Sequence, residues 1–262
     1  MDGRFSLRRS YLVLIALMVV FTVLSFVFKD EWFRSYFSNI AAGIIGSLFV
    51  IFLIDRIIER SMEKQRFEIV RIALERLRIP ILWHMQLLCN IYKAAAQKKP
   101  TPLPSTFEDT CKDDYYKEIS FLDFTKEAPV APRRNWFTHL DLETKSFKEK
   151  LEKVTDTYAN SFDVRLIRLL ERIINSRLFL IIPQMKNIPV VDRQEGFPPR
   201  VYTMFAGMEE FVKEHVSSML ELIKYFNATL EPPIQLSQEW WREDVAPTWG
   251  SGRLVQKKGK NK

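Results

Sequence analysis

Two long stretches without a charged residue stand near the beginning of the chain. Residues 10–28 form the first, with 19 residues, and residues 35–54 form the second, with 20. A helix rises about 1.5 Å per residue, so either stretch covers roughly 30 Å, the thickness of the hydrocarbon core of a bilayer. The pattern predicts a transmembrane hairpin over 10–58, with spans at about 10–28 and 36–55, preceded by a cytoplasmic tail over 1–9.

A cleaved signal peptide is the alternative interpretation of the first stretch. Arg4, Arg8 and Arg9 precede it, as they would in the positive region of a signal. The apolar region of a signal is usually about 7–15 residues long, however, and residues 25–28 show no small residues at cleavage spacing. A retained membrane span is the better interpretation.

Lysine and arginine near the span ends predict how the hairpin is oriented. The tail before the first span carries three, the connecting loop carries two, and the segment after the second span carries five. Because such residues are enriched on the cytoplasmic side, both termini are expected in the cytoplasm and the hairpin in the plasma or inner membrane. The residues counted are Arg4, Arg8, Arg9, Lys29, Arg34, Arg56, Arg60, Lys64, Arg66 and Arg71.

Small residues recur at every fourth position of the second span. One row is Ser38, Ala42 and Gly46, and the row beside it is Asn39, Gly43 and Ser47. Small side chains allow two helix backbones to approach closely in lipid. This face is expected to pack on the first span of the same chain; contact with a second copy and the lining of a pore are the alternatives.

The segment after the second span is charged but contains no glycine or proline, so the helix is expected to leave the membrane as a stalk. An acidic stripe, formed by Asp55, Glu59 and Glu63, lies beside a basic stripe, formed by Arg56, Arg60 and Lys64. The stripes are interpreted as a solvated surface, or as complementary surfaces that set the register of a neighbouring chain.

Three later segments carry apolar residues at steps of three and four, the spacing of a buried helical face; the second has consecutive four-residue steps, interpreted as a stutter within one helix. The first contains Pro80, which predicts a kink near residues 77–80 rather than two helices. Together they predict an antiparallel cytoplasmic bundle over 59–230, and hence an all-α membrane protein. The three seams run from Phe67 to Ile91, from Phe147 to Ile173 and from Val201 to Phe226.

The boundaries of these elements follow from capping and proline signals. A capping box at Ser105 predicts one short helix to about Ser120, and residues 121–138 are expected to form a loop. A helix of about 40 residues is expected from Asp141 to just before Pro183, with the apolar run 178–182 buried in the core. Another loop is expected over 184–200.

The segment 231–262 is expected to be irregular, because Pro232 and Pro233 stop the last helix. It holds a tryptophan cluster that is expected to anchor it to the bundle. The basic end of this tail accounts for most of the net charge of +7; it is interpreted as a solubilising tail or as a contact with anionic lipid, and nucleic acid is not favoured. The tryptophans are Trp240, Trp241 and Trp249, and the basic residues are Arg253, Lys257, Lys258, Lys260 and Lys262.

Candidate chemistry is sparse. The chain has 8 glycines, 2 cysteines and 3 histidines, and these show no phosphate-binding loop, activated nucleophile or metal-ligand spacing. No catalytic, cofactor or metal site is therefore predicted. His84 and His215 both lie on apolar seams, where they are interpreted as core histidines or as a buried pair that becomes charged when the pH falls.

The favoured hypothesis is a non-enzymatic membrane protein whose cytoplasmic bundle binds a protein partner or its own copies. The alternative is an oligomeric channel or pore-type effector gated through the stalk. A third hypothesis is a membrane-tethered enzyme whose polar pocket is not visible in the sequence.

Overall fold

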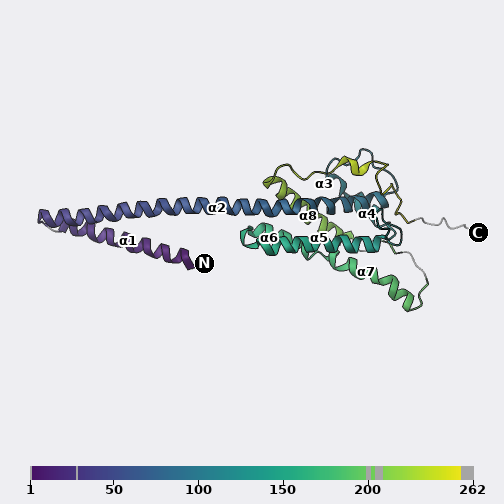
Figure 1. The fold of residues 1–262 in the computed structure, drawn as a ribbon, viewed down its shortest axis with the longest axis horizontal. Coiled ribbons are helices and arrows are strands. Elements are labelled where there is room, and N and C mark those ends of the chain that lie inside the picture. The colour runs from purple at the N-terminus through teal and green to yellow at the C-terminus, as the bar shows by residue number, and fades with distance from the viewer. Residues whose placement is uncertain (1, 28, 199–201, 204–208, 255–262) are drawn as a thin grey trace, which may run out of the picture. The chain divides into compact units, whose positions relative to one another are not determined.

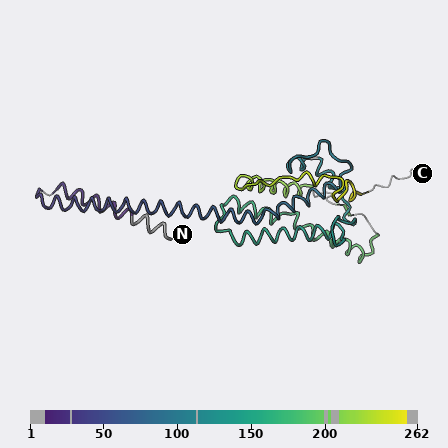
Figure 2. The backbone as a smooth tube through the Cα atoms, turned by 45° about the horizontal axis from the view of Figure 1, so that its top comes forward, coloured from purple at the N-terminus to yellow at the C-terminus, as the bar shows by residue number. Residues whose placement is uncertain are grey.

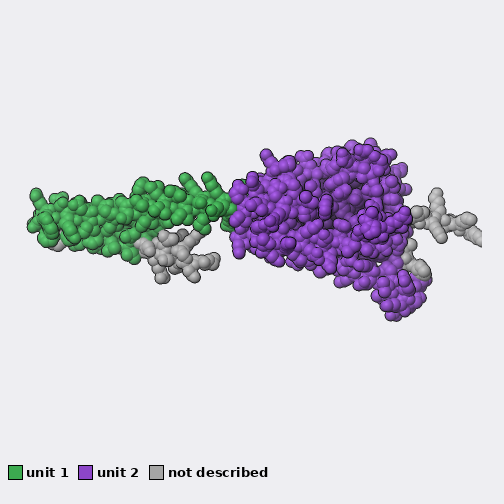
Figure 3. Space-filling model, in the orientation of Figure 1, with its two compact units in different colours: residues 1–67 green, residues 68–262 purple. Residues whose placement is uncertain are grey.

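The computed structural model describes residues 2–27, 29–198, 202–203 and 209–254. Over these residues the protein is all-helical, and the only β-type pairing is a set of three isolated bridges. The chain divides into two compact units, residues 1–67 and residues 68–262 (Figure 3).

The first unit consists of α1 (Asp2–Val27) and the beginning of α2 (Glu31–Ala95). The two helices lie side by side (Figures 1 and 2). The Tyr11 hydroxyl donates a hydrogen bond to Asp55 at 2.5 Å, and the rings of Phe21 and Phe37 stack at 6.1 Å. On α1, the less exposed residues are spaced by three and four, which is the spacing of a helix seam.

Most of the apolar side chains of this unit are exposed. Within the described residues, α2 is the one helix long and apolar enough to cross a membrane; only 6% of its most apolar window is buried. The apolar part of α1, Tyr11–Val27, falls short of that length. One long apolar helix near the N-terminus is therefore a feature of the fold, whereas a two-span hairpin stays a prediction.

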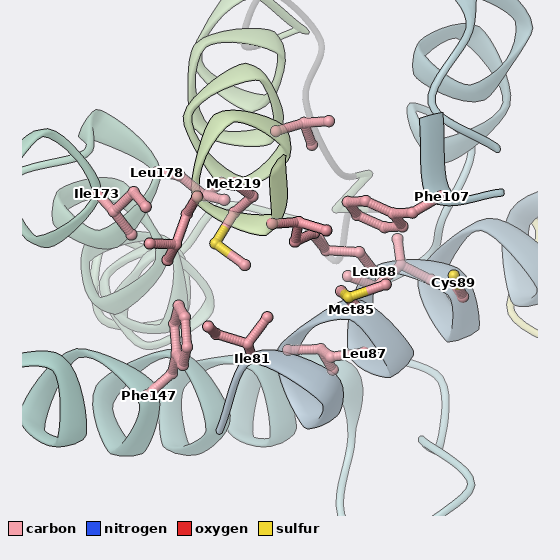
Figure 4. Close-up of a cluster of buried hydrophobic side chains, with 14 of the residues drawn as sticks. Ile81, Met85, Leu87, Leu88, Cys89, Phe107, Phe147, Ile173, Leu178 and Met219 are labelled. Atoms are coloured by element: carbon pink, nitrogen blue, oxygen red, sulfur yellow. The ribbon is translucent and has the colours of Figure 1, made fainter. Parts of the chain in front are cut away.

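The second unit places the end of α2 among shorter helices around one apolar core (Figure 1). α5 packs mainly against α7, and α6 packs against α8. Figure 4 shows Ile81 of α2, Phe147 of α5 and Met219 of α8 among the buried side chains of this core. The helices are α3 (Phe107–Thr110), α4 (Asp113–Ile119), α5 (Trp136–Tyr158), α6 (Val164–Ile174), α7 (Arg177–Gln194) and α8 (Glu209–Thr229).

The expectation of one helix of about 40 residues after Asp141 is wrong. α5 ends at Tyr158, the 3₁₀ turn Ala159–Ser161 follows, and α6 begins after Asp163, whose side chain accepts a hydrogen bond from the Leu166 N–H at 2.7 Å. The break falls where the apolar spacing has consecutive four-residue steps. A single straight helix would rotate those residues out of the core, and the capped break returns Phe162 and Leu166 to it.

The loop expected over 184–200 is also wrong, because α7 continues to Gln194 through Pro183 and Pro189. Each proline removes one backbone hydrogen bond. Burial of apolar side chains, including Leu178, Ile182 and Met185, offsets this loss. The run 178–182 is core as expected, with the exception of the exposed Leu180.

Two helix starts differ from expectation. α5 begins at Trp136 rather than Asp141, because the Asn135 side chain accepts a hydrogen bond from the Thr138 N–H. The single helix expected from Ser105 is instead the pair α3 and α4, and its N-cap is Thr106, which accepts from the Asp109 N–H.

The seams of α2 and α8 agree with expectation. The α2 seam is buried from Val70 to Ile91, although Phe67 at its start is exposed, and the helix is unbroken at Pro80. The kink itself stays a prediction. The described part of the last helix is Glu209–Thr229, and three residues of the predicted seam, Val201, Phe205 and Met208, lie outside the described residues.

Candidate functional site

The small residues of α2 lie on an exposed side of the first unit. A Cβ atom added at Gly43 or Gly46 would meet no described atom within 4 Å. The covered residues lie on another side of α2, where Ala41 is buried and the Phe37 ring stacks with the Phe21 ring of α1 at 6.1 Å. The expectation that the small-residue face packs on the first helix of the same chain is therefore wrong, because that contact uses another side of α2. The exposed set is Ser38, Asn39, Ala42, Gly43, Gly46 and Ser47.

The two charge stripes are exposed except at Asp55, which is half-buried beside Tyr11. Arg56 and Glu59 approach to 3.9 Å, a weak surface ion pair. Glu63, Arg60 and Lys64 are exposed as well. The stripes form a solvated surface in the single chain, and their pairing with another chain stays a prediction.

The structure brings His84 of α2 and His215 of α8 together in the core. Their Nε2 atoms lie 2.8 Å apart, and both side chains are buried. The His84 ring stacks on Phe147 at 4.1 Å, and Phe179 lies 4.7 Å from the His215 ring. The distance is that of a hydrogen bond in which one imidazole donates its Nε2 proton to the other.

Burial sets the protonation of this pair. It lowers the pKa of His84 well below its usual value, with a further contribution from His215, and lowers the pKa of His215 to about 3. Neither Nδ1 atom has a hydrogen-bond partner among the described atoms. Charging either ring would bury an uncompensated positive charge, which is costly. Protonation of either ring would therefore lower the stability of the folded second unit.

Other candidates for chemistry are also buried. Burial raises the pKa of the Cys89 thiol and that of Cys111 well above the usual range, so neither is an activated nucleophile. Burial lowers the pKa of His139 to about 4. Within the described ranges, no group of three or more His, Cys, Asp or Glu side chains is placed to hold a metal ion.

Comparison with protein-family models, with curated proteins and with solved structures finds no match for this chain. A function for this chain is therefore inferred from its own residues and structure.

Lys93 holds two parts of the chain together, a role that the sequence does not indicate. Its side chain is completely buried near the end of α2, and the ammonium group donates to the carbonyls of Trp240 at 3.1 Å, Val245 at 2.6 Å and Arg242. These carbonyls curve around it in and after the 3₁₀ turn Gln238–Trp241. Lys93 therefore fixes the C-terminal segment to the bundle.

The same segment closes the end of α2. The Lys93 carbonyl accepts from the Gly250 N–H at 3.0 Å, and the Ala94 carbonyl accepts from the Gly252 N–H at 2.9 Å. The last carbonyls of a helix lack partners within the helix, so these bonds satisfy them. The rings of Trp241 and Trp249 lie edge-on to the Tyr92 ring of α2, at 6.2 and 6.3 Å, and Trp241 is fully buried, so these two tryptophans anchor the segment to the bundle as expected.

Arg253 does not belong to a free basic tail. Its guanidinium donates to Glu118 and to the Ala95 carbonyl, and lies 4.3 Å from the Phe121 ring centroid. These contacts hold Arg253 on the bundle, so it is not part of a free solubilising tail, and contact of the basic tail with anionic lipid stays a prediction. The remaining basic residues of the tail, Lys257, Lys258, Lys260 and Lys262, lie outside the described residues.

Proposed function

We propose that this chain is a non-enzymatic, membrane-anchored interaction protein. In this proposal α1 and residues 31–58 cross the plasma or inner membrane as a two-span hairpin, with both termini in the cytoplasm. The unit from residue 68 onward is then a cytoplasmic helical bundle that binds a protein partner or another copy.

The observation that carries the proposal is the apolar surface of the first unit. Leu12, Phe26 and Phe49 are 67%, 76% and 62% exposed, and many other large apolar side chains of both helices are exposed beside them. Full burial of one such side chain is worth roughly 1.5–3 kcal/mol relative to water. A bilayer supplies that burial for all of them at once, whereas the contact between α1 and α2 covers only one side of each helix.

Two further features support a bilayer as the surrounding medium. Trp32 and Tyr36 stand at the turn between the helices, where amphipathic rings favour a membrane interface. At the other end, the Tyr11 hydroxyl bonds the Asp55 carboxylate. The ring stack and this hydrogen bond lie near the two ends of the hairpin, and hydroxyl groups between them, such as those of Thr22 and Ser47, donate to carbonyls of their own helix.

Reporter fusions test this topology. A fluorescent protein that matures in the cytoplasm and a phosphatase that is active only outside it are fused after Lys262, and separately inserted next to Lys29. The proposal expects fluorescence from the C-terminal fusion and phosphatase activity from the insertion. Phosphatase activity at the C-terminus would contradict it.

An oligomeric pore is the second candidate function. The exposed small-residue face of α2 around Gly43 and Gly46 favours it, because this face is not covered within the single chain. In a ring of copies this face would line or seal a channel. A pore conducts in a planar bilayer, and Gly46→Leu changes the conductance because the added side chain enters the lining. An anchor is electrically silent in the same assay.

A further inference from the structure

One end of the first unit is basic, and the other end is balanced in charge. Residues 2–9 of α1 and residues 55–66 of α2 together hold seven basic and four acidic residues. These two segments belong to the same end, because the Tyr11 hydroxyl donates to Asp55 and so aligns the beginning of α1 with this part of α2. At the turn between the helices, residues 29–34 hold two basic and two acidic residues. The excess of positive charge is therefore confined to one end of the hairpin.

The acidic stripe and the basic stripe of α2 lie on different sides of the helix. The acidic stripe is turned toward α1 at Asp55, whose carboxylate accepts the hydrogen bond from Tyr11. Successive positions of a helix are about 100° apart, so Arg56, Arg60 and Lys64 project from another side. All three are exposed. The basic stripe is therefore on a surface that α1 leaves uncovered.

The charge of the basic stripe is only weakly compensated within the chain. Arg56 approaches Glu59 at 3.9 Å, and the two side chains are 60% and 58% exposed, so this ion pair contributes little. Among the described residues, no carboxylate forms an ion pair with Arg60 or Lys64. The stripe is therefore open to an anionic partner from outside the chain.

The depth of the stripe matches the headgroup layer of a bilayer, a step that rests on the proposed function. If the second span ends near residue 55, Arg56 and Arg60 lie roughly 2 and 8 Å beyond the hydrocarbon core. The headgroup layer of one leaflet is about 5–7 Å thick. Lys64 lies roughly 14 Å beyond the core, and its flexible stem reaches back toward this layer.

We propose that the basic stripe, Arg56, Arg60 and Lys64, binds the phosphate headgroups of anionic phospholipids. Guanidinium groups donate paired hydrogen bonds to phosphate oxygens, and basic residues next to a span are attracted to an anionic leaflet. One turn before Arg56, on the same side of α2, Phe52 is 54% exposed. A bound lipid would place its phosphate on the stripe and an acyl chain along Phe52, whereas a free phosphate ion would use only the charge.

Native mass spectrometry of the full chain in detergent micelles tests this proposal. The micelles contain equal amounts of phosphatidylglycerol and phosphatidylcholine with the same acyl chains, so the two lipids differ in headgroup alone. The variant Arg56→Gln/Arg60→Gln/Lys64→Gln removes the charges of the stripe. The matched control Lys29→Gln/Arg34→Gln removes exposed charges at the other end of the hairpin. Orientation in a membrane plays no part in this assay, so a changed topology of either variant does not affect the result.

We expect the parent chain to bind phosphatidylglycerol at least fivefold in excess over phosphatidylcholine. The stripe variant should lower this preference at least threefold, and the control should keep it. No preference in the parent chain, or equal losses in the two variants, would overturn the proposal. A preference that the stripe variant keeps would assign lipid binding to another basic part of the chain. Binding of inorganic phosphate as strong as that of phosphatidylglycerol would assign the stripe to free phosphate. Either of these results would also overturn the proposal.

Failure of the lipid site and failure of the membrane anchor have different signatures. Loss of the lipid preference in a chain that alkaline carbonate leaves in the membrane removes the lipid site and keeps the anchor. Release by carbonate of a chain that prefers phosphatidylglycerol in micelles removes the anchor and keeps the lipid-binding stripe.

Discussion

Replacement of Lys93 by Met isolates the contact that holds the C-terminal segment to the bundle. Methionine has a similar length and is apolar, so it fills the space without supplying a donor. The carbonyls of Trp240, Arg242 and Val245 then lose the ammonium group that they share. The aromatic packing of the neighbouring Trp241 and Trp249 is left in place.

The expected loss of stability follows from these three bonds. A hydrogen bond to a charged group contributes about 1.5–3 kcal/mol, but bonds that share one donor are not additive. Burial also lowers the pKa of Lys93, which means that the folded unit bears a desolvation cost for this charge. Setting that cost against the bonds, we expect Lys93→Met to lower the free energy of unfolding by about 3 kcal/mol.

Urea unfolding of the full chain in detergent, followed by tryptophan fluorescence, measures this loss. With a slope of about 2 kcal/mol per molar urea, the midpoint should fall by roughly 1.5 M. Lys99→Met is the matched control, because Lys99 also reaches the C-terminal segment, through an exposed ion pair with Glu243 at 3.3 Å. An exposed pair is worth about 1 kcal/mol or less. Equal midpoints for the two variants would refute the reasoning.

Two further predictions concern the same unit. The pKa of His215 is about 3 in the folded chain and near 6.5 in the unfolded chain, and the pKa of His84 is also lowered by folding. Between these pH values the unfolded chain therefore binds more protons than the folded chain. The free energy of unfolding should be at its full value above about pH 6.5 and should fall below it by up to about 1.4 kcal/mol per pH unit for each histidine. Urea midpoints at pH 7.5 and 5.5 should therefore differ less in the His84→Leu/His215→Leu double variant than in the parent, and an unchanged difference would exclude the pair as its source. Gly252→Ala would place a Cβ atom 2.6 Å from Leu122 Cδ1 and 3.1 Å from Ala94 Cβ, and should cost about 1–3 kcal/mol. An unchanged melting temperature for this variant would show that the close approach at Gly252 is not required.

The apolar spacing of the sequence predicts the helical faces well where one face is buried throughout. The α8 seam from Val212 to Phe226 and most of the α2 seam lie in the core as expected. The breaks between α5, α6 and α7 were missed although Asp163 and Ser176, both good N-cap residues, mark them. The apolar residues continue at helical spacing from Phe147 to Ile173, which suggested one helix. Whether the extra four-residue step is absorbed within one helix or ends it depends on how the helices pack in the bundle.

Contacts between residues far apart in the chain were the hardest to predict. The seam positions of His84 and His215 suggest a buried pair, but not that the rings touch across 131 residues of sequence. The carbonyls that surround Lys93 come from a 3₁₀ turn and the irregular chain after it, 147–152 residues away, and no local sequence pattern predicts this arrangement. The spacing identified the row of α2 that the bundle covers, but not the second row of apolar residues that stays exposed, namely Ile69, Ile72, Ile79 and Trp83.

Extraction of membranes with alkaline carbonate tests the central claim most directly. Carbonate releases proteins that are held by charge or by protein contacts, and leaves those whose helices lie in the hydrocarbon core. The account predicts that the full-length chain stays in the membrane pellet, together with an integral marker protein. Release of the full-length chain into the supernatant, while that marker stays in the pellet, would contradict it.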